Sequence, residues 1–260
     1  MKQSFQDIEN EIRNETENRI KNLKNNNPEL KAVYVPMPLP NNKDKKVEYI
    51  FIAMEPSFGK WAKGSEKEAK IQLDKGFKNF LRSGEDFCFN YAIFKYLSPS
   101  YYLTDISRIA MSVKHADELR KKIYPECLKL LKKEMDIIGL PNVKIFLVGY
   151  GIKSFLNKDA TWKKMIENGT VLETIPHYST RSSTMRKIAP LLFRKEFNEF
   201  SKNIITEKKF QSFIQSLLKR NSVEKEMVKE ISDEYQKPNR LTKSRKELIF
   251  TYKKIFESLK

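Results

Sequence analysis

The chain has 260 residues, 40% of them hydrophobic, which is enough to bury the core of one α/β domain with a smaller addition. Fifty Lys and Arg against 33 Asp and Glu give a net charge of +17, which favours an anionic partner, most simply nucleic acid, although genomic base bias also produces lysine-rich chains. Cys88 and Cys127 match no zinc or iron–sulfur spacing, and the sequence shows neither a signal peptide nor an apolar run of about 18 residues. We therefore expect a reduced, cytoplasmic monomer that lies outside the membrane and uses no metal or cofactor.

The first third of the chain combines helical and extended patterns. Apolar residues at helical spacing predict a packing helix over 4–24, and the proline-rich stretch 31–40 is expected to be extended. The apolar run from Tyr49 to Met54 predicts a buried strand that stops at a carboxylate, Glu55. A basic amphipathic helix is predicted to follow over 65–82.

The middle of the chain repeats the alternation of strand and helix. The aromatic stretch from Phe87 to Leu97 is expected to be a loop followed by a short buried helix. A long helix is predicted over 116–138, interrupted by or restarted at Pro125. Further strands are predicted over 101–106, 143–148 and 171–175.

This alternation predicts the fold class α/β, in a three-layer α/β/α arrangement with a central parallel four-stranded sheet and helical additions at both ends. We expect residues 1–200 to form the α/β domain and residues 201–260 to form a basic helical extension. The apolar stripe of the last helix, 242–259, is expected to pack on the body, or alternatively to clamp a nucleic-acid backbone.

Chemically distinctive residues follow the predicted strands. Because the carboxyl ends of parallel strands meet at one edge of a sheet, Glu55, Asp105, Gly149 and His177 are expected to gather there. Glu55 then has two interpretations, a catalytic carboxylate or a solvated turn residue.

Four motifs taken in order resemble the uracil-DNA glycosylase superfamily over about residues 30–200. They are Ala53-Met54-Glu55-Pro56-Ser57, Tyr102-Leu103-Thr104-Asp105, Ile145 to Gly149, and His177-Tyr178-Ser179-Thr180. The resemblance implies hydrolysis of an N-glycosidic bond in DNA after the target nucleotide is extruded. It implies that Glu55 positions or deprotonates water and stabilises the cationic sugar, and that His177 donates to the departing base.

The same resemblance implies further contacts with the substrate. Met54 and Asp105 would contact the base, and Phe89 would stack on it, with Phe58 as the competing ring. Either phenylalanine is alternatively a core residue. Contacts to the DNA backbone would come from Ser57, Ser179 and Arg181, with Arg186 in reserve.

Asp105 departs from the family, which normally has Asn at the base-reading position. An ionised Asp only accepts hydrogen bonds and so suits an exocyclic amine such as cytosine N4. We therefore expect a modified cytosine as substrate, for example in phage DNA as part of antiphage defence. A protonated Asp105 would instead read uracil, as in ordinary repair. Tyr178 in place of proline and Ala53 in place of glycine also depart from the family.

Two alternatives belong to other classes. The chain would be a nucleic-acid-binding module if it kept the glycosylase fold and lost the reaction. If only the α/β scaffold is shared, another phosphorylated ligand would bind at the sheet edge.

Overall fold

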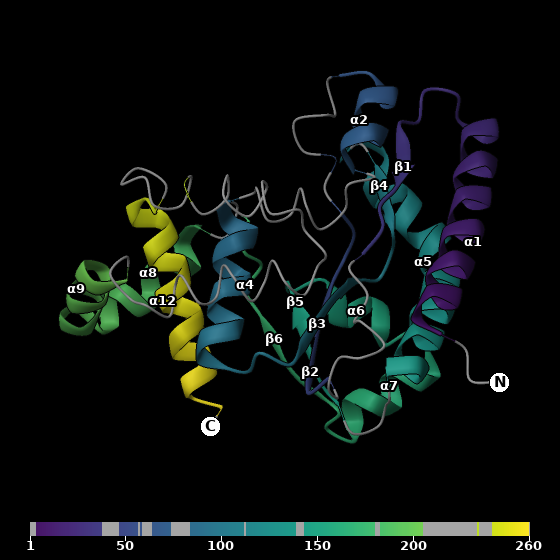
Figure 1. The fold of residues 1–260 in the computed structure, drawn as a ribbon. Coiled ribbons are helices and arrows are strands. Elements are labelled where there is room, and N and C mark those ends of the chain that lie inside the picture. The colour runs from purple at the N-terminus through teal and green to yellow at the C-terminus, as the bar shows by residue number, and fades with distance from the viewer. Residues whose placement is uncertain are drawn as a thin grey trace. The chain divides into compact units, whose positions relative to one another are not determined.

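The computed structural model describes residues 4–37, 47–56, 58, 64–73, 84–111, 113–138, 143–179, 183–204, 233 and 241–259. The chain forms two compact units that interleave along the sequence (Figure 1). The first unit comprises Met1–Asn79 and Tyr102–Ile175, and the second comprises Phe80–Tyr101 and Pro176–Lys260. The second unit therefore contains residues on both sides of the boundary predicted at residue 200.

The first unit is built on a four-stranded sheet in the order β3-β2-β5-β6 (Figure 1). Its strands are β2 (Tyr49–Ala53), β3 (Tyr101–Asp105), β5 (Lys144–Val148) and β6 (Val171–Ile175). Strand β5 pairs in parallel with β2 on one side and with β6 on the other. The predicted α/β class with a parallel four-stranded sheet is confirmed. A separate antiparallel pair, β1 (Ala32–Tyr34) and β4 (Ile109–Met111), was not predicted as strands because each has only three residues.

The helices of the first unit are α1 (Phe5–Asn26), α2 (Glu66–Leu73), α5 (Val113–Ile138), α6 (Ile152–Leu156) and α7 (Ala160–Glu167). Ser4 and Asp7 form a capping box that begins α1, because each side chain accepts from the other's backbone N–H. Helix α5 continues through Pro125, although an interruption was considered. The neighbouring Tyr124, Cys127 and Leu128 are buried, so packing offsets the hydrogen bond that proline cannot donate. The predicted helix over 65–82 is described only as far as Leu73.

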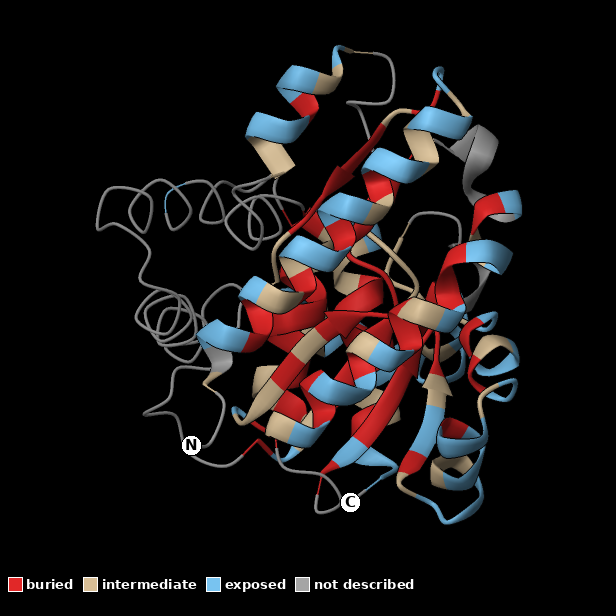
Figure 2. Ribbon diagram, turned by 90° about the vertical axis from the view of Figure 1, so that its right-hand side faces the viewer, coloured by how far each residue is buried: buried red, intermediate tan, exposed pale blue. Residues whose placement is uncertain are grey.

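One face of the sheet carries the main hydrophobic core of the first unit. Ile50 and Ile52 of β2 and Ile145 and Leu147 of β5 belong to this core, together with residues of α1, α5, α6 and α7. Figure 2 shows these strands as buried and the helices as buried on one side only. Because side chains alternate along a strand, the intervening Phe51 and Phe146 lie on the opposite face. Their rings stack there with centroids 5.1 Å apart.

The second unit is helical in the residues that the structure describes. Its helices are α4 (Gly84–Tyr96), α8 (Ser183–Leu192), α9 (Arg194–Asn203) and α12 (Lys243–Glu257). The predicted loop at Phe87 is wrong, because residues 87–96 all lie within α4, whereas the buried helix predicted after it is confirmed, since most residues of α4 are buried. Helix α12 packs on α4 and α8, and its buried Leu248, Ile249, Tyr252 and Phe256 confirm the predicted packing stripe.

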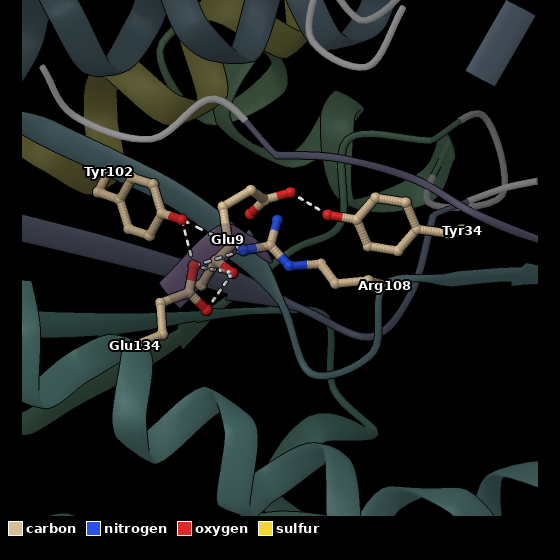
Figure 3. A network of polar contacts seen from close by, with 6 residues as sticks. Glu9, Tyr34, Tyr102, Arg108 and Glu134 are labelled. Atoms are coloured by element: carbon tan, nitrogen blue, oxygen red, sulfur yellow. Dashed lines mark hydrogen bonds and ion pairs between the residues drawn. The ribbon is translucent and has the colours of Figure 1, made fainter. Parts of the chain in front are cut away.

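A buried network of polar side chains links α1, β1, β3 and α5 within the first unit (Figure 3). Glu134 of α5 forms an ion pair with Arg108 and accepts a hydrogen bond from the Tyr102 hydroxyl. The side chains of Arg108 and Glu134 are only 4% and 2% exposed. Beside them the Tyr34 hydroxyl donates to Glu9, whose carboxylate is also buried.

Glu9 makes the stability of the first unit depend on pH. Burial raises the pKa of its carboxyl group, and this effect outweighs the opposing influence of Arg108 and Tyr34. The folded chain therefore binds this proton more tightly than the unfolded chain does. Protonation of Glu9 thus stabilises the fold fully below about pH 4.5, and this stabilisation is lost as pH rises through the raised pKa. We expect wild-type protein to lose stability relative to Glu9→Gln as pH rises from about 4.5 through the raised pKa.

Urea denaturation of both proteins across this pH range measures the difference. Glu17→Gln is the matched control, because Glu17 is exposed on the same helix and should leave the pH profile unchanged. A constant difference between wild type and Glu9→Gln at all pH values would contradict the prediction.

Candidate functional site

The carboxyl ends of β2 and β3 bring two of the predicted site residues to neighbouring positions. The backbone N–H of Ile106 donates to the carbonyl of Ala53 at 2.9 Å, and that of Ser107 donates to Met54 at 3.1 Å. The segments that leave the two strands therefore run side by side. Glu55 follows β2 directly after Met54, and Asp105 is the last residue of β3, 9% exposed.

Helix α5 holds the Glu55 carboxylate from the side. Arg120 Nε lies 3.0 Å from both carboxylate oxygens, and its Nη2 also donates to Oε1. The Tyr124 hydroxyl, one helical turn further on, donates to Oε2. The Glu55 side chain is 11% exposed and that of Arg120 22%, so this is a largely enclosed ion pair. Glu55 is therefore not the solvated turn residue that the alternative interpretation required.

No sequence pattern indicates Arg120 or Tyr124 as partners of Glu55. Burial raises the pKa of the Tyr124 hydroxyl, and the negative charge of Glu55 and, more weakly, that of Asp105 raise it further. The Tyr124 hydroxyl is thus a neutral hydrogen-bond donor, and the charges of both carboxylates raise its pKa. The ring of Phe155 from α6 packs edge-on against it, with centroids 4.7 Å apart.

The turn after β5 lies at the same edge of the sheet. Gly149 has a φ of 118°, which favours glycine, and its N–H donates to the carbonyl of Ile175 at the end of β6. A Cβ at Gly151 would lie 3.7 Å from the Met54 sulfur, so this turn approaches the end of β2. Met54 itself is partly buried and packs against the main core of the first unit.

Asp105 also lines a small cavity that lies between α1 and α5. Its walls include the buried groups Arg108 and Glu134 of the polar network and the Cys127 thiol, whose pKa is raised by burial. Arg108 Nη1 is buried without a hydrogen-bond partner. The cavity has room for about one water molecule, which is far too small for a nucleobase. This cavity is therefore not the base pocket that the sequence predicts for Asp105.

His177 lies in the second unit, where the backbone N–H of Ser179 donates to its Nδ1 at 3.0 Å. A neutral imidazole that accepts at Nδ1 carries its proton on Nε2, so Nε2 is the donor. The Tyr178 ring stacks on His177 with centroids 4.2 Å apart. The histidine is thus held in the tautomer that the predicted role requires.

The two candidate stacking rings both serve as packing residues in this structure. Phe89 of α4 is 1% exposed and stacks on Tyr178 with centroids 5.2 Å apart, while Tyr252 lies 4.9 Å away. Phe58 is 2% exposed and belongs to a separate cluster with Val33, Val35, Ala69 and Ala110. The alternative interpretation as core residues fits both rings.

The predicted backbone contacts have different outcomes. Arg186 is 3% exposed, and its guanidinium donates to the Tyr178 carbonyl and, at 3.1 Å, to the Ser244 hydroxyl. It therefore braces the loop that carries His177 and does not present its charge to a phosphate. Ser179 is half-buried, and its backbone N–H donates a hydrogen bond to Nδ1 of His177. Ser57 and Arg181 lie outside the described residues.

No protein-family model, curated protein or solved structure matches the chain significantly. Within the part of the chain that the structure describes, no group of three or more His, Cys, Asp or Glu residues is arranged to hold a metal ion. Among those residues, too, no helix is long and apolar enough to cross a bilayer. The fold and the site define an α/β protein whose sheet carries an ion-paired carboxylate at its carboxyl edge.

Proposed function

We propose that the chain is a monofunctional DNA glycosylase that acts on a flipped-out pyrimidine and leaves an abasic site. The observation that carries this proposal is the placement of Glu55 and Asp105 at neighbouring carboxyl ends of a parallel sheet, where ligands of such sheets bind. The net charge of +17 supports an interaction with DNA.

Hydrolysis of the N-glycosidic bond requires negative charge beside the sugar and a hydrogen-bond donor beside the base. As the N-glycosidic bond breaks, the sugar becomes cationic and the base departs as an anion. Glu55 would orient the attacking water and stabilise the cation. His177 would donate from Nε2 to the base oxygen, which agrees with its Nδ1 accepting from Ser179.

We propose that Asp105 determines which base the protein excises. As an ionised acceptor it suits the exocyclic amine of a cytosine, and a required modification would protect the cell's own DNA. The substrate would then be a modified cytosine such as those found in phage DNA. A protonated Asp105 would favour uracil instead, and the protein would act in repair.

Substitution at Asp105 tests this choice directly. Asp105→Asn is expected to move excision from modified cytosine towards uracil by at least about 10-fold in relative rate, because an amide accepts from N3–H and donates to O4. Single- and double-stranded oligonucleotides with one uracil, cytosine or substituted cytosine, followed by alkaline cleavage, measure the abasic product. Asp136→Asn, at an exposed position on α5, is the control.

Two results would count against these assignments. Equal preferences in Asp105→Asn and wild type would remove the base-reading role. No abasic product from any substrate, while a known glycosylase cleaves in the same assay, would overturn the proposed activity.

One observation favours a second candidate, a nucleic-acid-binding module on the same fold that lacks catalysis. The Arg120 guanidinium already neutralises much of the charge that Glu55 would use to stabilise a cation. Tight DNA binding by wild-type protein, with Glu55→Gln and His177→Ala indistinguishable from it in every assay, would establish this function.

A further inference from the structure

Tyr150 is an exposed aromatic residue on the turn that joins β5 to α6 (Figure 1). It is 63% exposed, and among the described residues of the first unit no other aromatic residue is as exposed. The turn follows the carboxyl end of β5, which pairs in parallel with β2 and β6. Tyr150 therefore lies at the same edge of the sheet as Glu55.

Hydrogen bonds hold the backbone on both sides of Tyr150. The N–H of Gly149 donates to the carbonyl of Ile175 at 2.9 Å, which fixes the turn against β6. On the other side the Ser154 hydroxyl donates to the carbonyl of Gly151 at 2.7 Å. Helix α6, which follows, is anchored in the main core of the first unit by its buried residues. The exposed ring is therefore carried by a turn that is fixed at both ends.

The same turn lies beside the end of β2. A Cβ at Gly151 would lie 3.7 Å from the sulfur of Met54. Met54 directly precedes Glu55 in the chain. Tyr150 is thus next to a residue that approaches the strand of the candidate catalytic carboxylate, at the edge where open parallel sheets bind their ligands.

Tyr150 offers what the two rings suggested by the sequence do not. Phe89 and Phe58 are buried among other side chains of the protein. A tyrosine ring is large and rigid and has only two side-chain torsions, so ordering it against a ligand costs little entropy. Nucleobases of every kind stack on such rings, because every base has a π-face. Tyr150 is therefore an aromatic surface at the sheet edge that a base can reach.

We propose that Tyr150 stacks on an unpaired base beside the target nucleotide, so that the protein selects single-stranded DNA. This inference rests on the proposed function, because it takes DNA as the ligand at this edge. A ring this exposed suits a base on the surface of the protein and not one enclosed in a catalytic pocket. Stacking of one base on an aromatic ring strengthens binding by about 5- to 100-fold. Because taking a base out of a duplex costs a similar free energy, the contact gives a net gain only where the base is already unpaired.

Replacement of the ring should affect single strands alone. Tyr150→Ala is expected to weaken binding of a single-stranded oligonucleotide by about 5- to 20-fold and binding of the duplex by less than about 2-fold. Tyr150→Phe, which keeps the ring, should bind single strands within about 2-fold of wild type. The slope of log K against log salt should be the same for all these proteins, because a ring contact neutralises no phosphate.

Fluorescence anisotropy over a salt series measures these affinities with a labelled oligonucleotide that contains only thymine, alone and paired with its adenine complement. Leu172→Ala is the matched control, because Leu172 is 38% exposed near the amino end of β6, at the opposite edge of the sheet. Thermal melting of each variant comes first, and replacement of the exposed Tyr150 should leave the melting temperature unchanged. Tyr150→Leu, which is apolar but has no ring, replaces Tyr150→Ala if the latter does not fold.

The possible failures are distinguishable. If Tyr150→Ala binds single strands like wild type or Leu172→Ala, weakens the duplex equally, or is matched by Tyr150→Phe, the stacking role is overturned and the proposed function stands. If Tyr150→Ala selectively loses affinity for single strands but no oligonucleotide loses a base, the glycosylase activity fails while Tyr150 remains a DNA contact. Failure of wild-type protein to bind either form of DNA overturns both.

Discussion

Replacing Glu134 by glutamine is expected to lower the free energy of unfolding by about 3–5 kcal/mol. The change keeps the shape of the side chain but removes the charge that pairs with Arg108, at a place where both side chains are almost fully buried. Tyr102 and Thr104 also lose the carboxylate that accepts their hydroxyl hydrogen bonds. Arg108 would then be a buried guanidinium without its ion-pair partner.

Urea denaturation followed by circular dichroism measures this loss. Glu126→Gln, which breaks an exposed pair on the same helix, should cost less than about 1 kcal/mol. The double variant Arg108→Met with Glu134→Leu should recover most of the stability, since a buried ion pair often does no better than apolar groups of similar size. A loss below about 1 kcal/mol for Glu134→Gln would show that this ion pair contributes little.

Glu55→Gln is expected to reduce the single-turnover rate of base excision by about 10²- to 10⁴-fold, the usual contribution of a positioned general base. Glutamine can still accept from Tyr124 but carries no charge to stabilise the cationic sugar. Because the Glu55–Arg120 pair is largely enclosed, the free energy of unfolding should fall by about 1–3 kcal/mol, between the cost of breaking an exposed ion pair and that of breaking a buried one.

Quenched-flow or manual sampling with excess protein, on the best substrate of the oligonucleotide panel, gives the rate. Glu167→Gln is the control, because Glu167 is exposed on α7. Full activity of Glu55→Gln would remove Glu55 from the mechanism. A large loss of stability in the same variant would mean that Glu55 serves mainly to hold α5 against β2.

The elements that the sequence predicted well are those with a strong local pattern. The strand that precedes Glu55 and the helix α1 were predicted within a few residues, because apolar periodicity and turn residues act over short distances. Around Phe89 a buried helix was predicted correctly, but the loop predicted before it is wrong. A helix that is buried on most sides shows no clear hydrophobic period, so its start is not marked in the sequence.

Local sequence patterns could not predict the partners of the site residues. Arg120 and Tyr124 meet Glu55 across 65 and 69 residues of chain, and no spacing in the sequence pairs them. The same holds for Arg186, which the resemblance named as a reserve DNA contact but which donates to the Tyr178 carbonyl and the Ser244 hydroxyl. Such pairings depend on how the sheet and helices pack.

The sequence by itself determined the parallel sheet, the basic charge and the carboxylates at the ends of β2 and β3, since strand periodicity and turn residues act locally. Only the tertiary structure decided that Glu55 is held by Arg120 and Tyr124 and that Phe89 and Phe58 are packing residues. The physical reason is that hydrogen bonds and burial join residues far apart in the chain, and their energies depend on the surroundings that folding creates.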